Sequence, residues 1–148
     1  MTKEERGQSL FEVVLALAIA ALIIIAIVAL ATISIRNANF SRNQSLATRY
    51  AQEAIEWLRG QRDEDWDAFA TRALTPLWCL KSLSWTGVTT IGECGSSDFI
   101  SDTIFKREVS FTIFDASSID TEVKVYWEDA QGLHETKTVT TFTDWREQ

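Results

Sequence analysis

The sequence contains few of the residues that build catalytic and metal sites. Its 148 residues include one histidine, His134, one proline, Pro76, and two cysteines, Cys79 and Cys94. Two cysteines and a distant histidine do not supply the four ligands of a structural zinc site, and no nucleophile stands in a triad-like pattern with His134. The sequence therefore predicts no metal, no cofactor and no enzymatic activity.

Positive charge is also scarce. The formal net charge is −7 at pH 7, whereas direct binding of nucleic acid requires a basic surface, so we expect none. The acidic run at residues 63–67 lacks the central glycine and closing glutamate of an EF-hand calcium loop. We interpret it as a solvated helix end. An acidic surface fits a domain exposed to water.

Charge is missing altogether from Val13 to Ile35. As a helix this run would be ~35 Å long, enough to cross a hydrocarbon core of roughly 30 Å. It is longer than the apolar core of about 7–15 residues in a secretory signal, and no small-x-small cleavage site separates it from the first charges. A soluble protein would have to be much larger to bury such a helix. We therefore predict a membrane-spanning helix, with apolar positions at Val13, Leu17, Ile24, Val28 and Ile35.

One carboxylate, Glu12, stands at the edge of this apolar run, five residues after Gly7. An ionised carboxylate costs roughly 2.5–3.5 kcal/mol at the centre of a bilayer, and less near its edge. Two interpretations remain. Glu12 caps the membrane helix at the interface, or it has a functional role that requires a charged partner. We favour the functional role, because an acid in a membrane segment indicates function by default.

The predicted helix continues beyond the apolar run, over residues 9–60. No Gly or Pro lies within residues 36–59, and Gly60 is the expected C-cap or weak point, with one or two further turns before Pro76. Small or apolar side chains in the second half, residues 36–60, are spaced by four, three and four, which places them on one helical face. They are Ala47, Ala51, Ala54 and Leu58.

Residues 61–103 are expected to connect this helix to a sheet. The part from Leu77 to Asp102 is rich in Ser, Thr and Gly, and predicts an irregular loop with one short strand near residues 85–91. It holds Cys79 and Cys94. A disulfide between them would close a loop of about 15 residues and contribute roughly 3 kcal/mol, and we favour it over free thiols.

The C-terminal third, residues 104–143, alternates between apolar and polar side chains. Period-two runs separated by Asp/Ser and Gly turns predict about three to four antiparallel strands with one packed face. We expect that face to lie against the amphipathic half of the helix, which makes the fold class α+β. The expected core residues of the sheet are Val109, Phe111, Val123, Val125, Trp127 and Val139.

The order of these features resembles the type IV pilin-like proteins, a superfamily of type IV pilins, minor pilins and the pseudopilins of type II secretion. The resemblance rests on Gly7, the segment Gln8-Ser-Leu-Phe-Glu12, the uncharged run and the sheet that follows. It is most specific over residues 3–36. Further along, YAQEAIEWLRGQRDEDW resembles the end of the helix in minor pilins and pseudopilins.

The resemblance implies a processing site and an assembly residue. A membrane-embedded prepilin peptidase would cut between Gly7 and Gln8, and Glu12 would form a salt bridge with the free amine of a neighbouring subunit. Two positions depart from the family. Gln8 replaces the Phe that usually opens the mature chain, which leaves N-terminal methylation open. Ala29 stands where many major pilins carry a proline, which favours a minor pilin or pseudopilin.

In this interpretation residues 1–7 are a leader peptide, residues 8–35 the transmembrane and assembly helix, and residues 36–148 an extracytoplasmic pilin domain. The protein would be stored in the inner membrane as a single-pass protein with a cytoplasmic N-terminus, and then enter a pilus or pseudopilus filament. The implied partners are the prepilin peptidase, other pilin or pseudopilin subunits, the assembly platform with its ATPase, and the membrane. The alternative is an unprocessed, single-pass membrane anchor that carries an extracytoplasmic binding domain.

Overall fold

The computed structural model describes residues 4–86, 89–115 and 117–145. The chain forms two compact units, one ending at Arg42 and the other beginning at Asn43. The elements, in chain order, are the helices α1 (Glu4–Glu64) and α2 (Trp66–Ala73), and the strands β1 (Leu77–Cys79), β2 (Thr90–Ile91), β3 (Lys106–Asp115), β4 (Ser118–Asp129) and β5 (Gly132–Thr143).

The first unit is helical from Glu4, earlier than the expected start at residue 9. Glutamate and arginine, which are good helix formers, precede Gly7 and extend the helix. Between residues 13 and 35 the large apolar side chains are 50% to 68% exposed. By length and composition, α1 is long and apolar enough to cross a membrane. It is therefore a candidate membrane anchor or signal sequence.

The end of α1 differs from the prediction at Gly60. The helix runs through Gly60 and ends at Glu64, although glycine in a helix costs about 1 kcal/mol relative to alanine. A tertiary contact supports the extra turn, because the Arg62 guanidinium lies 5.6 Å from the centroid of the Phe142 ring. The expectation of a C-cap at Gly60 is therefore wrong, and the reason is packing against the sheet.

The connection between α1 and the sheet is more regular than expected. Asp65 forms the N-cap of α2, and its side chain accepts a hydrogen bond from the Ala68 amide at 3.0 Å. β1 pairs with both β2 and β3. These two strands contain only three and two residues, so they are too short for alternation to reveal them. The short strand expected near residues 85–91 corresponds only to β2.

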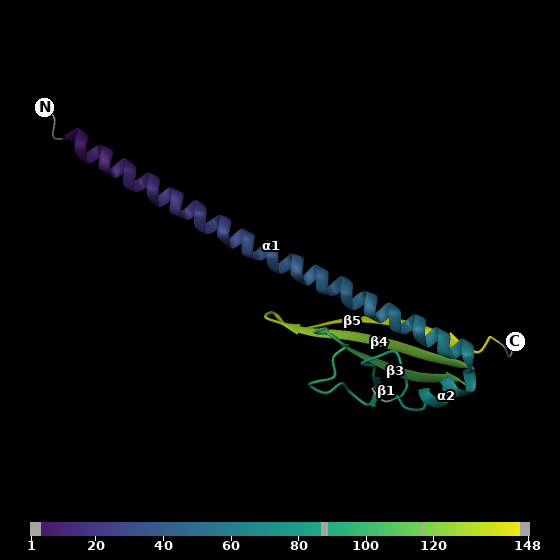
Figure 1. Ribbon diagram of the computed structural model, residues 1–148. Coiled ribbons are helices and arrows are strands. Elements are labelled where there is room, and N and C mark those ends of the chain that lie inside the picture. Colours follow the sequence, from purple (N-terminus) through teal and green to yellow (C-terminus); the bar gives the residue numbers. More distant parts are fainter. Residues whose placement is uncertain (1–3, 87–88, 116, 146–148) are drawn as a thin grey trace. The chain divides into compact units, whose positions relative to one another are not determined.

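The five strands form one antiparallel sheet in the order β2-β1-β3-β4-β5 (Figure 1). β3, β4 and β5 are the long strands and follow one another as hairpins. The α+β class is confirmed. The sheet has five strands rather than three to four, because β1 and β2 add to the edge of β3.

The core lies between the sheet and the part of α1 that belongs to the second unit. Figure 1 shows this part of α1 running along the sheet. The predicted helical face is confirmed, and so are five of the six expected core residues of the sheet. The predicted residues that are buried are Ala47, Ala51, Ala54, Leu58, Val109, Phe111, Val123, Val125 and Trp127. Alanines let the helix backbone approach the larger side chains of the strands.

Val139 is 65% exposed, so its expected place in the core is wrong. It lies opposite Glu122 in the β4–β5 pair, and residues opposite each other point to the same side of a sheet. The alternate residues of β5 face α1 instead. Gln44 Nε2 of α1 donates to Thr136 Oγ1 at 2.6 Å, and Phe142 is buried. Threonines occupy both faces of β5, so alternation alone does not reveal which face is inside.

Arg107 is an unexpected member of the core, with 2% of its surface exposed. Its Nε donates to the Leu80 carbonyl at 3.3 Å, and its NH1 donates to the Tyr50 carbonyl at 3.1 Å. Burial lowers the pKa of Arg107, and the nearby Glu53 carboxylate, 3.5 Å from NH1, partly opposes that shift. The guanidinium thus joins β3 to α1 within the second unit.

Candidate functional site

Gly7, Gln8 and Glu12, the predicted processing and assembly residues, all lie in α1. Gln8 and Glu12 are four residues apart and so share one face of the helix. The Glu12 side chain is exposed. Because glycine destabilises a helix by about 1 kcal/mol relative to alanine, the backbone at Gly7 unwinds more readily than its surroundings. A cut after Gly7 would leave a new amine at Gln8, about one helical turn from Glu12.

The predicted membrane positions form a stripe along α1. They are separated by four or seven residues, a spacing that keeps them on one side of a helix. Each is more than half exposed, and so are the other large apolar side chains between residues 13 and 35, apart from Leu15 and Ile19 at 50%. A helix that is apolar on every side needs an apolar environment on every side. The stripe consists of Val13, Leu17, Ile24, Val28 and Ile35.

Cys79 and Cys94 are joined by a disulfide, with their Cα atoms 5.0 Å apart. Cys79 lies in β1, and Cys94 belongs to the loop that follows β2. The Cys94 amide also donates to Glu108 Oε1 at 2.9 Å. The disulfide and this hydrogen bond both attach the loop to the sheet, on the face opposite α1.

Glu108 is the centre of a polar cluster under this loop, and only 3% of its surface is exposed. Tyr126 Oη donates to its Oε1 at 2.8 Å, and Lys124 Nζ lies 2.7 Å from its Oε2. Burial alone would raise the pKa of Glu108, but hydrogen bonds from Lys124, Cys94 and Tyr126 outweigh it and lower that pKa. The pKa of Lys124 is raised, chiefly by its bond to Glu108. Burial, followed by the bond to Glu108, raises the pKa of Tyr126.

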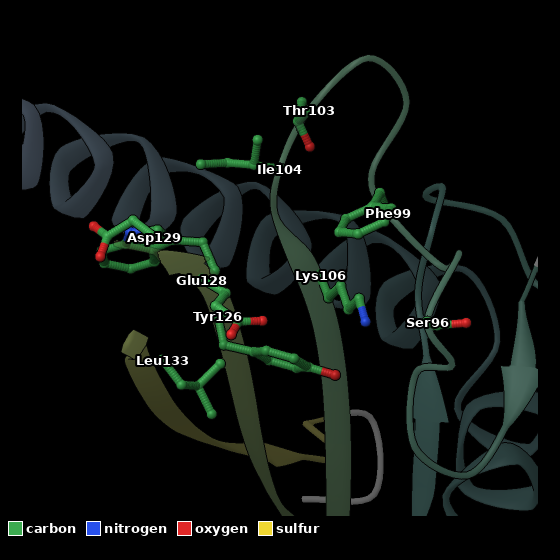
Figure 2. Close-up of a pocket in the computed structure, with 10 residues that line it drawn as sticks. Ser96, Phe99, Thr103, Ile104, Lys106, Tyr126, Glu128, Asp129 and Leu133 are labelled. Atoms are coloured by element: carbon green, nitrogen blue, oxygen red, sulfur yellow. The ribbon is translucent and has the colours of Figure 1, made fainter. Parts of the chain in front are cut away.

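A groove of about 700 Å³ lies next to this cluster, between the loop and the β4–β5 hairpin (Figure 2). Aromatic and charged side chains line it together. Lys106 Nζ is 4.9 Å from the centroid of the Phe99 ring and 6.0 Å from that of Tyr126. Such distances allow cation–π attraction. The groove already contains its own cation over these aromatic faces.

His134 lies beside the groove within hydrogen-bond distance of Asp129, with Nε2 and Oδ1 2.9 Å apart. Its ring stacks on Trp127 with 5.2 Å between centroids. Asp129 also accepts a hydrogen bond from the backbone amide of Gln131 at 2.8 Å. Its contacts with Gln131 and His134 therefore stabilise the β4–β5 turn. Hydrogen bonds from Gln131 and His134 lower the pKa of Asp129 against the opposing effect of desolvation.

Sequence reasoning did not find the groove or the cluster around Glu108. The residues come from a loop and from β3, β4 and β5, and only strand pairing and loop placement bring them together. Glu108 and Lys124 are opposite each other in the β3–β4 pair, a register that the alternation pattern does not specify. Among the residues that the structure describes, no group of three or more His, Cys, Asp or Glu side chains is placed to hold a metal ion.

Comparisons of the chain with profiles of known protein families, with curated proteins and with solved structures give no match. The basis for a function is therefore the chain's own residues and geometry.

Proposed function

We propose that this chain is a structural subunit, a minor pilin or pseudopilin, of a type IV pilus or a type II secretion-like filament. A prepilin peptidase cuts it after Gly7, and it polymerises through α1. The observation that carries the proposal is the placement of Glu12. It is a single acid at the edge of an uncharged helical segment whose residues are all exposed, five residues after a glycine.

The apolar segment of α1 supports a role in both storage and assembly. Its side chains are exposed all around the helix, and water is a poor solvent for such a surface. In a bilayer the segment is a single-pass anchor. In a filament, the same side chains pack against the equivalent helices of neighbouring subunits. One segment thus serves two apolar environments without any change of sequence.

Glu12 supplies the specificity that apolar packing lacks. Helices that are apolar all round can slide along one another at little cost, whereas a buried charge pair is strongly destabilised when one partner is missing. After cleavage, the amine of Gln8 in one subunit can pair with Glu12 of its neighbour. That pair sets the axial register, as a single buried polar residue does in coiled coils.

The second unit suits the outside of the cytoplasmic membrane. The chain is acidic overall, and the disulfide between Cys79 and Cys94 is of a kind that persists in oxidising compartments. The N-terminus would then face the cytoplasm. The partners are the prepilin peptidase, other subunits, and the assembly platform with its ATPase. The role is mechanical, and we assign no catalytic residue.

Mass spectrometry of the protein isolated from cells tests the proposal. A mature chain that begins at Gln8 is the expected result, and a Gly7→Trp variant, which puts a bulky residue at the cut, should retain residues 1–7. A wild-type chain that keeps residues 1–7 while fully functional would contradict the proposal. That result would favour the alternative, an unprocessed membrane anchor carrying a binding domain, for which the groove beside Phe99 and Tyr126 would be the place to look.

A further inference from the structure

β5 is a long, open edge of the sheet. It stands last in the strand order and, among the residues that the structure describes, pairs with β4. Its register with β4 is continuous from Asp129↔Gly132 to Ser118↔Thr143, without a bulge. The strand at the other end of the sheet, β2, has only two residues. Along such an edge of 12 residues, the backbone N–H and C=O groups of alternate residues point away from β4, where another strand can bind them.

The outward side chains of β5 form a self-complementary pattern. Leu133 and Val139 are 67% and 65% exposed, and between them lie Glu135 and Lys137, whose side chains are about half exposed. In chain order these are apolar, acidic, basic and apolar. Read in the opposite direction, the apolar positions coincide and the two charges exchange sign.

We propose that β5 pairs antiparallel with β5 of a second copy of this chain, with Thr136 on the two-fold axis. Each Glu135 then lies opposite Lys137 of the second copy, and each Leu133 lies opposite Val139. Opposite charges and apolar side chains placed directly across an antiparallel pair stabilise it. On the other face, Thr136 meets its own equivalent, and threonine pairs are also favourable. The interface is isologous, as most two-fold interfaces are.

The charges select this register over its neighbours. Centring the pair on Lys137 would place the two Lys137 side chains opposite each other, and centring it on Glu135 would do the same for the two acids. A register centred between two residues would set outward side chains against inward ones, because strand side chains alternate. Within its own chain, Lys137 lies 3.7 Å from Glu122 and 3.5 Å from Glu135. Its ammonium therefore already lies on the outward face where the second Glu135 would arrive.

The pairing is independent of the proposed filament. Subunits of one polar filament all point the same way, whereas a two-fold axis reverses the direction of β5. The contact therefore joins two copies that do not belong to the same filament, such as copies on two filaments that lie side by side. Failure of the filament proposal would leave this inference intact, and the reverse also holds.

Charge exchange in the full-length chain tests the pairing. Two differently tagged copies are purified in detergent micelles, and capture of one by the other is measured. Glu135→Lys and Lys137→Glu should each weaken self-capture about tenfold or more, because two attractive pairs become repulsive in the dimer. Mixing the two variants should restore capture, because every repulsive pair becomes attractive in the mixed dimer. The double variant should capture itself as the wild type does.

Disulfide trapping checks the register. A cysteine at the two-fold axis, Thr136→Cys, should crosslink to its own equivalent under mild oxidation. The matched control is Thr138→Cys on the same face, whose equivalents would be ~13 Å apart and beyond disulfide reach. Three results would each overturn the proposal. In the first, all charge variants capture themselves equally; in the second, mixing Glu135→Lys with Lys137→Glu does not restore capture. In the third, Thr136→Cys and Thr138→Cys crosslink equally.

Discussion

The two halves of α1 share one secondary structure but differ in what surrounds them. Between residues 13 and 35 the helix is apolar on every side, and every residue is exposed. From Ala47 to Leu58 it has one buried face, made largely of alanines that contact the sheet. The first half is suited to any apolar environment, whereas the second half packs closely against one specific surface, the sheet. Substitutions at equivalent residue types should therefore have different consequences in the two halves.

The largest expected effect is on membrane insertion. Ile24→Lys places a charge near the middle of the apolar segment and should disfavour insertion by about 2.5–3.5 kcal/mol. The thermal unfolding of the second unit should not change, because Ile24 does not belong to its core. The measurement is the membrane-bound fraction after cell fractionation, with Ile24→Leu as the control. If Ile24→Lys associates fully with the membrane, the first half of α1 does not depend on an apolar environment in the way proposed.

Loss of the disulfide should have an energetic effect nearly as large as that of Ile24→Lys, but on the stability of the second unit alone. The double variant Cys79→Ser/Cys94→Ser opens a loop of 15 residues and should reduce the free energy of unfolding by about 3 kcal/mol. Thermal melting followed by circular dichroism measures it. Reduction of the wild-type protein with dithiothreitol should reproduce the variant. A wild-type melting curve that reductant does not move would contradict the prediction.

The same substitution in each half compares them directly. Ala51→Leu overfills the fully buried contact between α1 and the sheet and should cost about 1–3 kcal/mol of stability. Ala21→Leu adds the same atoms at an exposed position and should leave stability unchanged. Chemical denaturation of both variants gives the difference. Equal effects would mean that the alanine face is not closely packed.

Replacement of Glu12 should impair assembly more than folding. In the proposed filament, Glu12→Ala would leave the amine of a neighbouring subunit without its partner and should reduce incorporation about tenfold, equivalent to roughly 1.4 kcal/mol. Membrane insertion and cleavage after Gly7 should persist. Immunoblotting of sheared filaments against the membrane fraction measures the ratio. Normal incorporation would remove the register role from Glu12.

The smallest effect concerns pH and the cluster at Glu108. Its pKa is lowered in the folded state, so its contribution to stability is present above its unfolded pKa of about 4.3 and is lost as the pH falls through the folded value. The raised pKa values of Lys124 and Tyr126 give stability that is lost above about pH 10. Glu108→Gln should flatten both ends of a plot of melting temperature against pH.

Tyr126→Phe provides the control for that experiment, because it removes one hydrogen bond to Glu108 and retains the ion pair with Lys124. It should therefore retain most of the acid dependence while losing part of the alkaline dependence. If Glu108→Gln keeps the wild-type slope below pH 5, other carboxylates govern the acid transition. Asp98 is one of these, since its bonds to Lys81 and Gly95 lower its pKa.

Much of the fold could be predicted because its strongest signals are local. The spacing of Ala47, Ala51, Ala54 and Leu58 follows helical geometry, and all four are buried. The alternation in β3 and β4 likewise identified Val109, Val123 and Val125 as core. Where a strand has only two or three residues, as in β1 and β2, there is no period to detect. Where both faces carry threonine, as in β5, the period does not identify the inner face, and Val139 was misplaced.

The candidate sites also fall into two groups, those with a local sequence signal and those that depend on tertiary structure. Local sequence is enough to specify the uncharged segment from Val13 to Ile35, the position of Glu12 relative to Gly7, and the face of α1 that is buried. Each of these depends only on residues that are neighbours along one helix. Tertiary structure alone decided the open edge of β5, the groove beside Phe99 and the burial of Glu108 under the disulfide loop. Those features depend on strand register and loop placement, which are fixed by packing between residues far apart in the chain.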